Sequence, residues 1–172
     1  MAAITDTFDL GRLQLHSGEG RRVDVDVRID SLVLAGQTYS AEGGRVTARL
    51  DVSHMTSGYA LRLRFDTKLQ GPCMRCLDDA DRGFSIDARE VDHPGGGDDD
   101  LRSPYLEGEE LDVRAWARDA LALALPTKIV CTADCRGLCA ICGENLNKAG
   151  PDHHHEAAPD PRWAKLSELK LD

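Results

Sequence analysis

The sequence has few aromatic residues and no apolar run long enough to cross a bilayer. Aromatic residues make up 5% of the 172 residues, whereas hydrophobic residues make up 41%. The start, MAAITDTFDLGRL, has no basic flank leading into an apolar stretch, so a secretory leader is not indicated. We therefore expect a soluble cytoplasmic protein with no membrane partner. In a reducing compartment, its six cysteines are better explained as metal ligands than as disulfides.

Short catalytic motifs are also missing. The chain contains no nucleophile elbow, phosphate loop, dinucleotide fingerprint or H-E-x-x-H motif. The sequence GEGRR at 18–22 is too short to cradle a phosphate. We therefore expect a protein that is not an enzyme, with no catalytic residues and no small-molecule substrate.

The negative charge is concentrated in the middle of the chain. The net charge is −9, and residues 77–119 alone carry five Lys/Arg against fourteen Asp/Glu, while the two flanking segments are close to neutral. Phosphate binding needs local positive potential, so the overall charge does not favour a nucleic-acid partner. It does not exclude one either, because the flanking segments could present a basic face.

The first half of the sequence has the period of two that is typical of half-buried antiparallel strands. The segments 46–52 and 59–69 alternate apolar and charged residues, and 53–58 between them suits a hairpin loop. Residues 23–29 and 84–91 are further strand candidates. We predict an α+β fold whose first half is an antiparallel sheet or a small open barrel.

The second half predicts helices. The acidic Gly/Asp-rich stretch within 93–108 indicates a mobile loop. A helix is expected over 111–126, capped by Asp112 and ended by Pro126, with Leu111, Ala115, Leu121 and Leu125 on its apolar face. A short C-terminal helix is expected over 160–170. The predicted organisation is one domain, with a β region over 1–92, the loop over 93–108, and residues 109–172 packed on the sheet.

The cysteines are spaced as metal ligands. Two C-x-x-C pairs, Cys73–Cys76 and Cys139–Cys142, can each turn two thiolates toward one ion, and Gly143 can take the positive φ that such a knuckle needs. A third pair has the spacing C-x-x-x-C, and a run of three histidines follows later in the chain. The remaining candidates are Cys131, Cys135, His153, His154 and His155. The sequence thus predicts one or two structural zinc ions.

Three pairings of these ligands are open. Cys131, Cys135, Cys139 and Cys142 could close one local site, or the two C-x-x-C pairs could share one ion. In the pairing that we favour, Cys73 and Cys76 meet Cys131 and Cys135, and Cys139 and Cys142 join two histidines, with His153 and His155 as first choice. Each site then links two turns that are distant in sequence, which is the usual construction of a zinc ribbon.

Four motifs occur in a distinctive order. They are C-x-R-C-L at 73–77, L-P-x-x-x-x-C at 125–131, G-L-C-x-x-C-G-x-N-L-N at 137–147 and D-P-R-x-x-x-L at 160–166. Together they resemble the YceD family of bacterial and plastid proteins. The resemblance implies a role in 23S ribosomal RNA accumulation, processing or ribosome assembly, without an assigned reaction. Many relatives place a C-x-C pair where this chain has residues 152–156, DHHHE, and histidine can replace cysteine as a zinc ligand.

The implied partner is a large-subunit ribosomal RNA precursor or a large-subunit ribosomal protein. A candidate RNA-binding face lies on the strands, with Tyr59 nearby for base stacking and with Asp51 and Asp66 as acidic neighbours that could balance it. It consists of Arg45, Arg49, Arg62, Arg64, Lys68 and Arg75. The alternatives are an acidic adaptor for a basic ribosomal protein, a metal-dependent RNA hydrolase using Glu144 or Glu156, and a redox-switched zinc protein.

Overall fold

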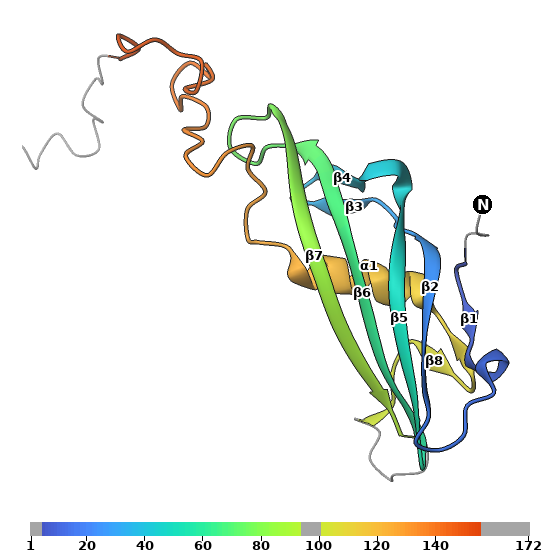
Figure 1. The fold of residues 1–172 in the computed structure, drawn as a ribbon. Helices are drawn as coiled ribbons and strands as arrows, with labels where there is room; N and C mark the ends of the chain where they lie inside the picture. Colours follow the sequence, from blue (N-terminus) through green and yellow to red (C-terminus); the bar gives the residue numbers. More distant parts are fainter. Residues whose placement is uncertain (1–4, 94–100, 156–172) are drawn as a thin grey trace, which may run out of the picture.

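The computed structural model describes residues 5–93 and 101–155 of the chain. This part is mostly antiparallel β-structure with one α-helix (Figure 1), so the predicted fold class is confirmed at that level. The C-terminal helix expected over 160–170 lies outside the described residues. The strands are β1 (Phe8–Asp9), β2 (Gly20–Arg28), β3 (Leu32–Leu34), β4 (Gln37–Ala41), β5 (Arg45–Met55), β6 (Gly58–Pro72), β7 (Asp79–Asp92), β8 (Leu106–Glu107) and β9 (Glu110–Leu111); the helix is α1 (Val113–Ala124).

The main sheet has six strands in the order β2-β5-β6-β4-β3, and β7 also pairs with β6. The alternating residues predicted as strands form β5 and β6, with Leu50 opposite Leu63 on the buried face. Met55 pairs with Gly58, so the turn is shorter than the loop expected over 53–58. Within the described residues the sheet stays open, because β7 pairs only with β6.

Several short strands had no signal in the sequence. β3 and β4 form a hairpin beside β6, and β1, β9 and β8 form a separate three-stranded sheet. Residues near the N-terminus contribute to the core, since Leu10 and Tyr39 are at most 1% exposed. Strands of two to five residues are too short to show a period, and only tertiary pairing identifies them.

Helix α1 covers one face of the sheet (Figure 1). Asp112 is its N-cap, as predicted, and accepts a hydrogen bond from the Ala115 N–H at 2.8 Å. The predicted apolar stripe is wrong except at Leu121, because Leu111 belongs to β9 and the helix starts at Val113. Its buried face is made by Val113, Trp116, Ala117, Ala120 and Leu121.

Beyond α1 the chain continues past the loop that joins β6 to β7 and forms a small extension at that end of the sheet (Figure 1). Ile129 anchors the start of this extension: it is buried, its carbonyl accepts from the Met74 N–H at 2.8 Å, and its N–H donates to Met74 Sδ at 3.4 Å. No helix among the described residues combines the length and apolar character of a membrane span.

Candidate metal centres

The first candidate centre consists of four thiols from two parts of the chain. Cys73 and Cys76 lie in the loop between β6 and β7, and Cys131 and Cys135 come from the segment after α1. Cys73 Sγ lies 3.7 Å from Cys135 Sγ, and Cys76 Sγ lies 3.6 Å from Cys131 Sγ. Three of the four residues are at most 3% exposed. The centre therefore joins the end of the main hairpin to the chain beyond the helix.

These separations fit a tetrahedral zinc ion. With Zn–S bonds of about 2.3 Å, tetrahedral geometry places two ligand sulfurs about 3.8 Å apart. All four sulfurs lie within 4.8 Å of one another. Four thiolates are also the donor set that zinc prefers in closed structural sites. The residues present thus suit a zinc ion without rearrangement of the backbone.

The second candidate centre combines Cys139 and Cys142 with His153 and His155. Cys142 Sγ lies 3.8 Å from His153 Nε2, and a tetrahedral zinc would place such a sulfur and nitrogen about 3.6 Å apart. His154 turns away, since its Nδ1 lies 2.6 Å from the Asp152 carbonyl oxygen. The structure therefore groups the ligand candidates in the pairing favoured above, including the choice of histidines.

Both C-x-x-C turns have the same backbone hydrogen bonds. The Leu77 N–H donates to the Cys73 carbonyl at 3.0 Å, and the Gly143 N–H donates to the Cys139 carbonyl at 2.9 Å. The residue after the second cysteine takes positive φ in each, 62° for Leu77 and 76° for Gly143. Gly143 was expected to do so. Leucine is disfavoured there by about 1–2 kcal/mol, and the turn's hydrogen bond from its N–H to the Cys73 carbonyl helps to hold Leu77 in place.

Glu144 positions one histidine of the second centre. Its Oε2 lies 2.9 Å from His153 Nδ1, on the opposite side of the ring from the Nε2 that faces Cys142. A carboxylate in this place fixes the ring orientation and the tautomer with Nε2 free to bind metal. Glu144 thus acts through His153, which is a different role from the catalytic acid of the hydrolase alternative. Glu156, the other candidate acid, lies outside the described residues.

We expect Glu144→Gln to weaken zinc binding at the second centre by about 10- to 100-fold, because the outer carboxylate no longer orients His153. Competition with a graded series of chelators, read by zinc released per chain, measures the change. Asp152→Asn is a matched control, since it removes a neighbouring exposed carboxylate that makes no ion pair within the described part of the chain. Equal affinities for the two variants would contradict the role of Glu144.

The two centres are attached to each other by polar contacts. The Leu138 N–H donates to the Arg75 carbonyl at 3.1 Å, and Asn147 Nδ2 donates to Cys135 Sγ at 3.3 Å. Asn145 Nδ2 donates to Asp78 at 2.8 Å. Neither asparagine was predicted to have a role, although both lie in the G-x-N-L-N motif that carries the resemblance. In both contacts the amide nitrogen is the donor.

The thiols differ in how readily they ionise. Burial opposes ionisation of Cys73, but backbone N–H groups of Cys76 and Arg75 outweigh it and lower the pKa of its thiol to about 6. Backbone N–H groups and the His153 ring lower the pKa of Cys139 to about 6 as well. Burial raises the pKa of Cys76 to about 12. The lowered pKa of Cys73 and of Cys139 favours their thiolates, whereas the raised pKa of Cys76 means that a bound metal ion would have to stabilise its thiolate.

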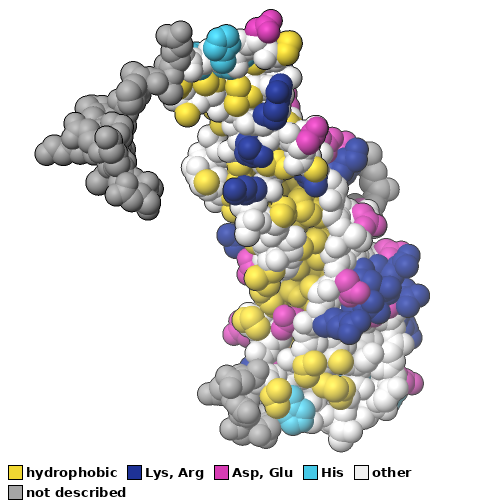
Figure 2. All heavy atoms as spheres, turned by 90° about the vertical axis from the view of Figure 1, so that its left-hand side faces the viewer, with side chains coloured by type: hydrophobic (Ala, Val, Ile, Leu, Met, Phe, Trp, Pro, Cys, Tyr) yellow, Lys and Arg dark blue, Asp and Glu magenta, His cyan; other side chains and the backbone are white. Residues whose placement is uncertain are grey.

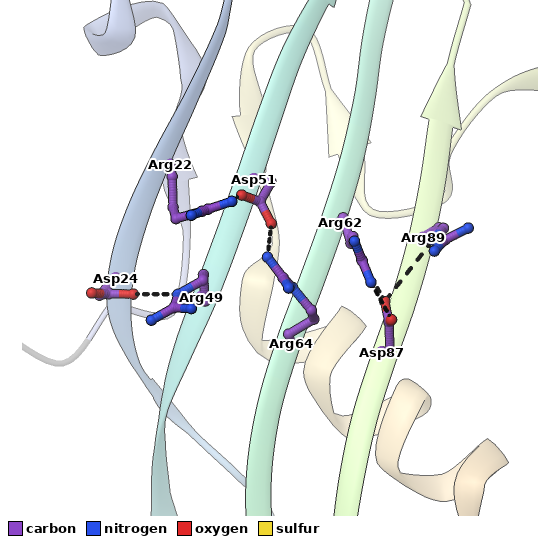
Figure 3. Close-up of polar contacts among 8 residues, drawn as sticks. All are labelled: Arg22, Asp24, Arg49, Asp51, Arg62, Arg64, Asp87 and Arg89. Carbon is purple, nitrogen blue, oxygen red and sulfur yellow. Dashed lines mark hydrogen bonds and ion pairs between the residues drawn. The ribbon is translucent and has the colours of Figure 1, made fainter.

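The basic residues predicted as an RNA face lie mainly on the side of the sheet opposite α1 (Figure 3). Arg49, Arg62 and Arg64 make ion pairs with aspartates there. Arg45 and Lys68 are exposed on the same strands, whereas Arg75 lies apart from them, in the first C-x-x-C turn.

Tyr59 is not available to this face. It alternates with the outward arginines of β6, and its hydroxyl donates to Glu109 Oε1 at 3.1 Å while its ring packs on His54. The expectation that Tyr59 stacks on bases beside the arginines is therefore wrong. Asp98, Asp99 and Asp100, in the acidic segment expected to attract a basic partner, lie outside the described residues.

Similar proteins are known from bacteria and from a plant. Uncharacterized proteins of Mycobacterium tuberculosis and Mycobacterium bovis are 30% identical over 156 residues, which is 88% of this chain and 63% of theirs. A maize protein described as large ribosomal RNA subunit accumulation protein YCED homolog 1, chloroplastic, is 28% identical over 183 residues, covering 85% of this chain and 60% of its own length. The chain thus spans less than two thirds of these relatives. No solved structure matches.

A family model described as large ribosomal RNA subunit accumulation protein YceD matches residues 61–170. The matched range contains most of the β6–β7 hairpin, all of α1 and every ligand candidate of both centres. This protein belongs to the YceD family.

Proposed function

We propose that this protein is a non-enzymatic factor in the accumulation of large-subunit ribosomal RNA, acting in 23S rRNA processing or ribosome assembly, and that two structural zinc ions hold its fold. The family supplies the link to large-subunit RNA, since both the family model and the maize relative carry that description. The observation that carries the zinc is the meeting of four cysteines from two distant segments at tetrahedral spacing.

A structural role for the metal is favoured over a catalytic one. A catalytic zinc keeps one position open for water or substrate, whereas each cluster here offers four Cys or His ligand atoms. A carboxylate beside the second centre, Glu144, is engaged with His153. X-ray absorption on the zinc-loaded protein tests this: we expect only sulfur and nitrogen atoms bound to the metal, and an oxygen ligand would support the hydrolase alternative instead.

The experiment that tests the function is crosslinking in the protein's own host. The protein is tagged, crosslinked briefly and purified under stringent washing, and the bound RNA is sequenced while the proteins are identified. Large-subunit precursor RNA at a defined site is the expected result. A parallel strain depleted of the protein should contain less mature large-subunit RNA relative to small-subunit RNA. An unchanged ratio after full depletion would refute the proposal.

An acidic adaptor is the second candidate. A hollow of about 530 Å³ near the β1-β9-β8 sheet is lined by four acidic residues, Asp9, Glu107, Glu109 and Glu110, and by one basic residue, Arg12. Such a concentration of carboxylates attracts basic proteins, and ribosomal proteins are basic. Recovery of one ribosomal protein without crosslinked RNA, and its loss on Glu107→Gln/Glu110→Gln, would favour this candidate.

A further inference from the structure

Arginines face one another across the exposed side of the sheet. Arg49 on β5 lies directly opposite Arg64 on β6, and Arg62 on β6 lies directly opposite Arg89 on β7. Like charges in directly opposed positions destabilise a sheet. The fold does not require these two arginine pairs, and each adds electrostatic repulsion that destabilises the sheet. An anion bound between the paired guanidinium groups would reduce this repulsion.

Aspartates balance these arginines only in part. Asp51 bonds Arg22 and Arg64, Asp87 bonds Arg62 through both oxygens and lies near Arg89, and Asp24 lies 3.5 Å from Arg49 (Figure 3). The network thus contains five guanidinium groups and three carboxylates, a net charge of +2, counted over Arg22, Arg49, Arg62, Arg64, Arg89, Asp24, Asp51 and Asp87. The pairs of Arg49 with Asp24 and of Arg89 with Asp87 are exposed and long, at 3.5 and 4.0 Å, so they contribute little and leave those two arginines able to engage another anion.

The same arginines line a hollow of about 510 Å³. Three arginines (Arg49, Arg62 and Arg64) and three aspartates (Asp24, Asp66 and Asp87) line it, together with the hydroxyl-bearing residues Thr47 and Ser85. Arg64 Nε is buried and has no hydrogen-bond partner within the described residues. Figure 2, seen from the β7 edge, shows a large group of Lys and Arg side chains, with Asp and Glu side chains beside it, toward the side of the sheet that faces away from α1; further Lys and Arg side chains lie higher in the view. A buried donor without a partner thus lies in a hollow whose three arginines are matched by three aspartates, and the surplus of guanidinium groups belongs to the wider network that includes Arg22 and Arg89.

We propose that this arginine cluster (Arg22, Arg49, Arg62, Arg64 and Arg89) binds phosphate groups of an RNA backbone. Guanidinium groups match phosphate oxygens bidentately, and the proposal names the RNA contact of the ribosomal role given above, on which it rests. RNA is favoured over an acidic protein because phosphates repeat along one strand and can occupy several arginines in succession.

The kind of recognition follows from what the face presents. Across the described residues, no aromatic side chain shares the outward face of β5 and β6 with the arginines, and Tyr59 points to the other side. Base reading by single-strand binders relies on aromatic stacking. The arginine cluster therefore holds the backbone and leaves sequence choice to another part of the complex.

The test measures RNA affinity in solution at several salt concentrations. The probes are a transcript of the large-subunit precursor and an unrelated transcript of the same length. We expect Arg49→Gln/Arg64→Gln to weaken binding of both about tenfold, and to reduce the slope of log K against log salt by about 0.7 for each phosphate that the variant no longer neutralises. Arg12→Gln/Arg118→Gln is the control, because it removes the same charge from exposed sites elsewhere. Equally weakened binding in both double variants would overturn the proposal.

A second variant should strengthen RNA binding, because it removes a carboxylate and keeps all the arginines. Asp87→Asn frees Arg62 from its competing carboxylate, so we expect about threefold tighter RNA binding. Unchanged or weaker binding would contradict the proposal. A second contradicting result concerns Arg49→Gln/Arg64→Gln. If this variant binds RNA as the wild type does but no longer co-purifies an acidic protein that the wild type binds, the arginine cluster binds that protein and not RNA.

The outcomes separate this inference from the proposed function. If the arginine variants bind RNA normally but depletion still lowers large-subunit RNA, the binding site is wrong and the function stands. If depletion has no effect although the variants bind RNA weakly, the site stands and the function is wrong.

Discussion

Replacing Cys135 with serine should remove one zinc ion per chain and unfold the extension beyond α1. Cys135 is 1% exposed and its sulfur lies 3.7 Å from that of Cys73, so serine would leave a buried ligand position with a poor donor. Binding of a structural zinc contributes on the order of 10 kcal/mol, more than the roughly 2–5 kcal/mol that truncating a large core side chain costs. Native mass spectrometry and thermal unfolding measure the two effects.

The control for this prediction is Cys142→Ser in the second centre. Cys142 is exposed and its centre lies away from the sheet's core, so we expect loss of one zinc with a much smaller fall in the unfolding temperature. Hydrogen exchange should then show fast exchange around residues 139–153 only. Two results would contradict the prediction: Cys135→Ser retains two zinc ions, or it lowers the unfolding temperature no more than Cys142→Ser does. Either would show that the first centre does not stabilise the fold by joining the β6–β7 loop to the segment after α1.

Gly71→Ala should destabilise the protein by about 2–3 kcal/mol. A Cβ at Gly71 would overlap the ring of Tyr39 and come within 2.9 Å of the Thr38 carbonyl oxygen. Tyr39 is fully buried and cannot move aside without repacking, and overpacking in a core costs about 1–3 kcal/mol. Chemical denaturation measures the change.

Tyr39→Phe distinguishes the steric effect from the hydrogen bond. The Tyr39 hydroxyl donates to the Pro72 carbonyl at 2.7 Å, next to Cys73. We expect its removal to cost about 1 kcal/mol, and the double variant to be less stable than Gly71→Ala by no more than that amount. A wild-type stability for Gly71→Ala would show that β4 is free to shift away from β6.

Long-range order decided what sequence reasoning missed. The outward arginines of β5 and β6 were recognised from alternation, but their aspartate partners on β2 and β7 depend on strand register. For example, Arg22 on β2 pairs with Asp51 on β5, and Asp87 on β7 pairs with Arg62 on β6. The strands β2 and β7 lie on opposite sides of the β5–β6 pair. Tyr59 was misplaced for a local reason instead: within β6 it takes the opposite face from Arg62 and Arg64, which the alternation of residues along the strand already indicates.

The sequence by itself determined the candidate metal ligands, the two C-x-x-C turns, the positive φ at Gly143 and the antiparallel strands, because these depend on contacts within a few residues. Which cysteines lie together was decided by the tertiary structure, since the β6–β7 loop and the segment after α1 meet only when the helix packs across the sheet. His153 and His155 were already the first choice from the sequence, and the structure adds the physical reason why His154 is left out, since its ring turns to the Asp152 carbonyl oxygen. Local chemistry selects donors, and packing brings distant donors to one point.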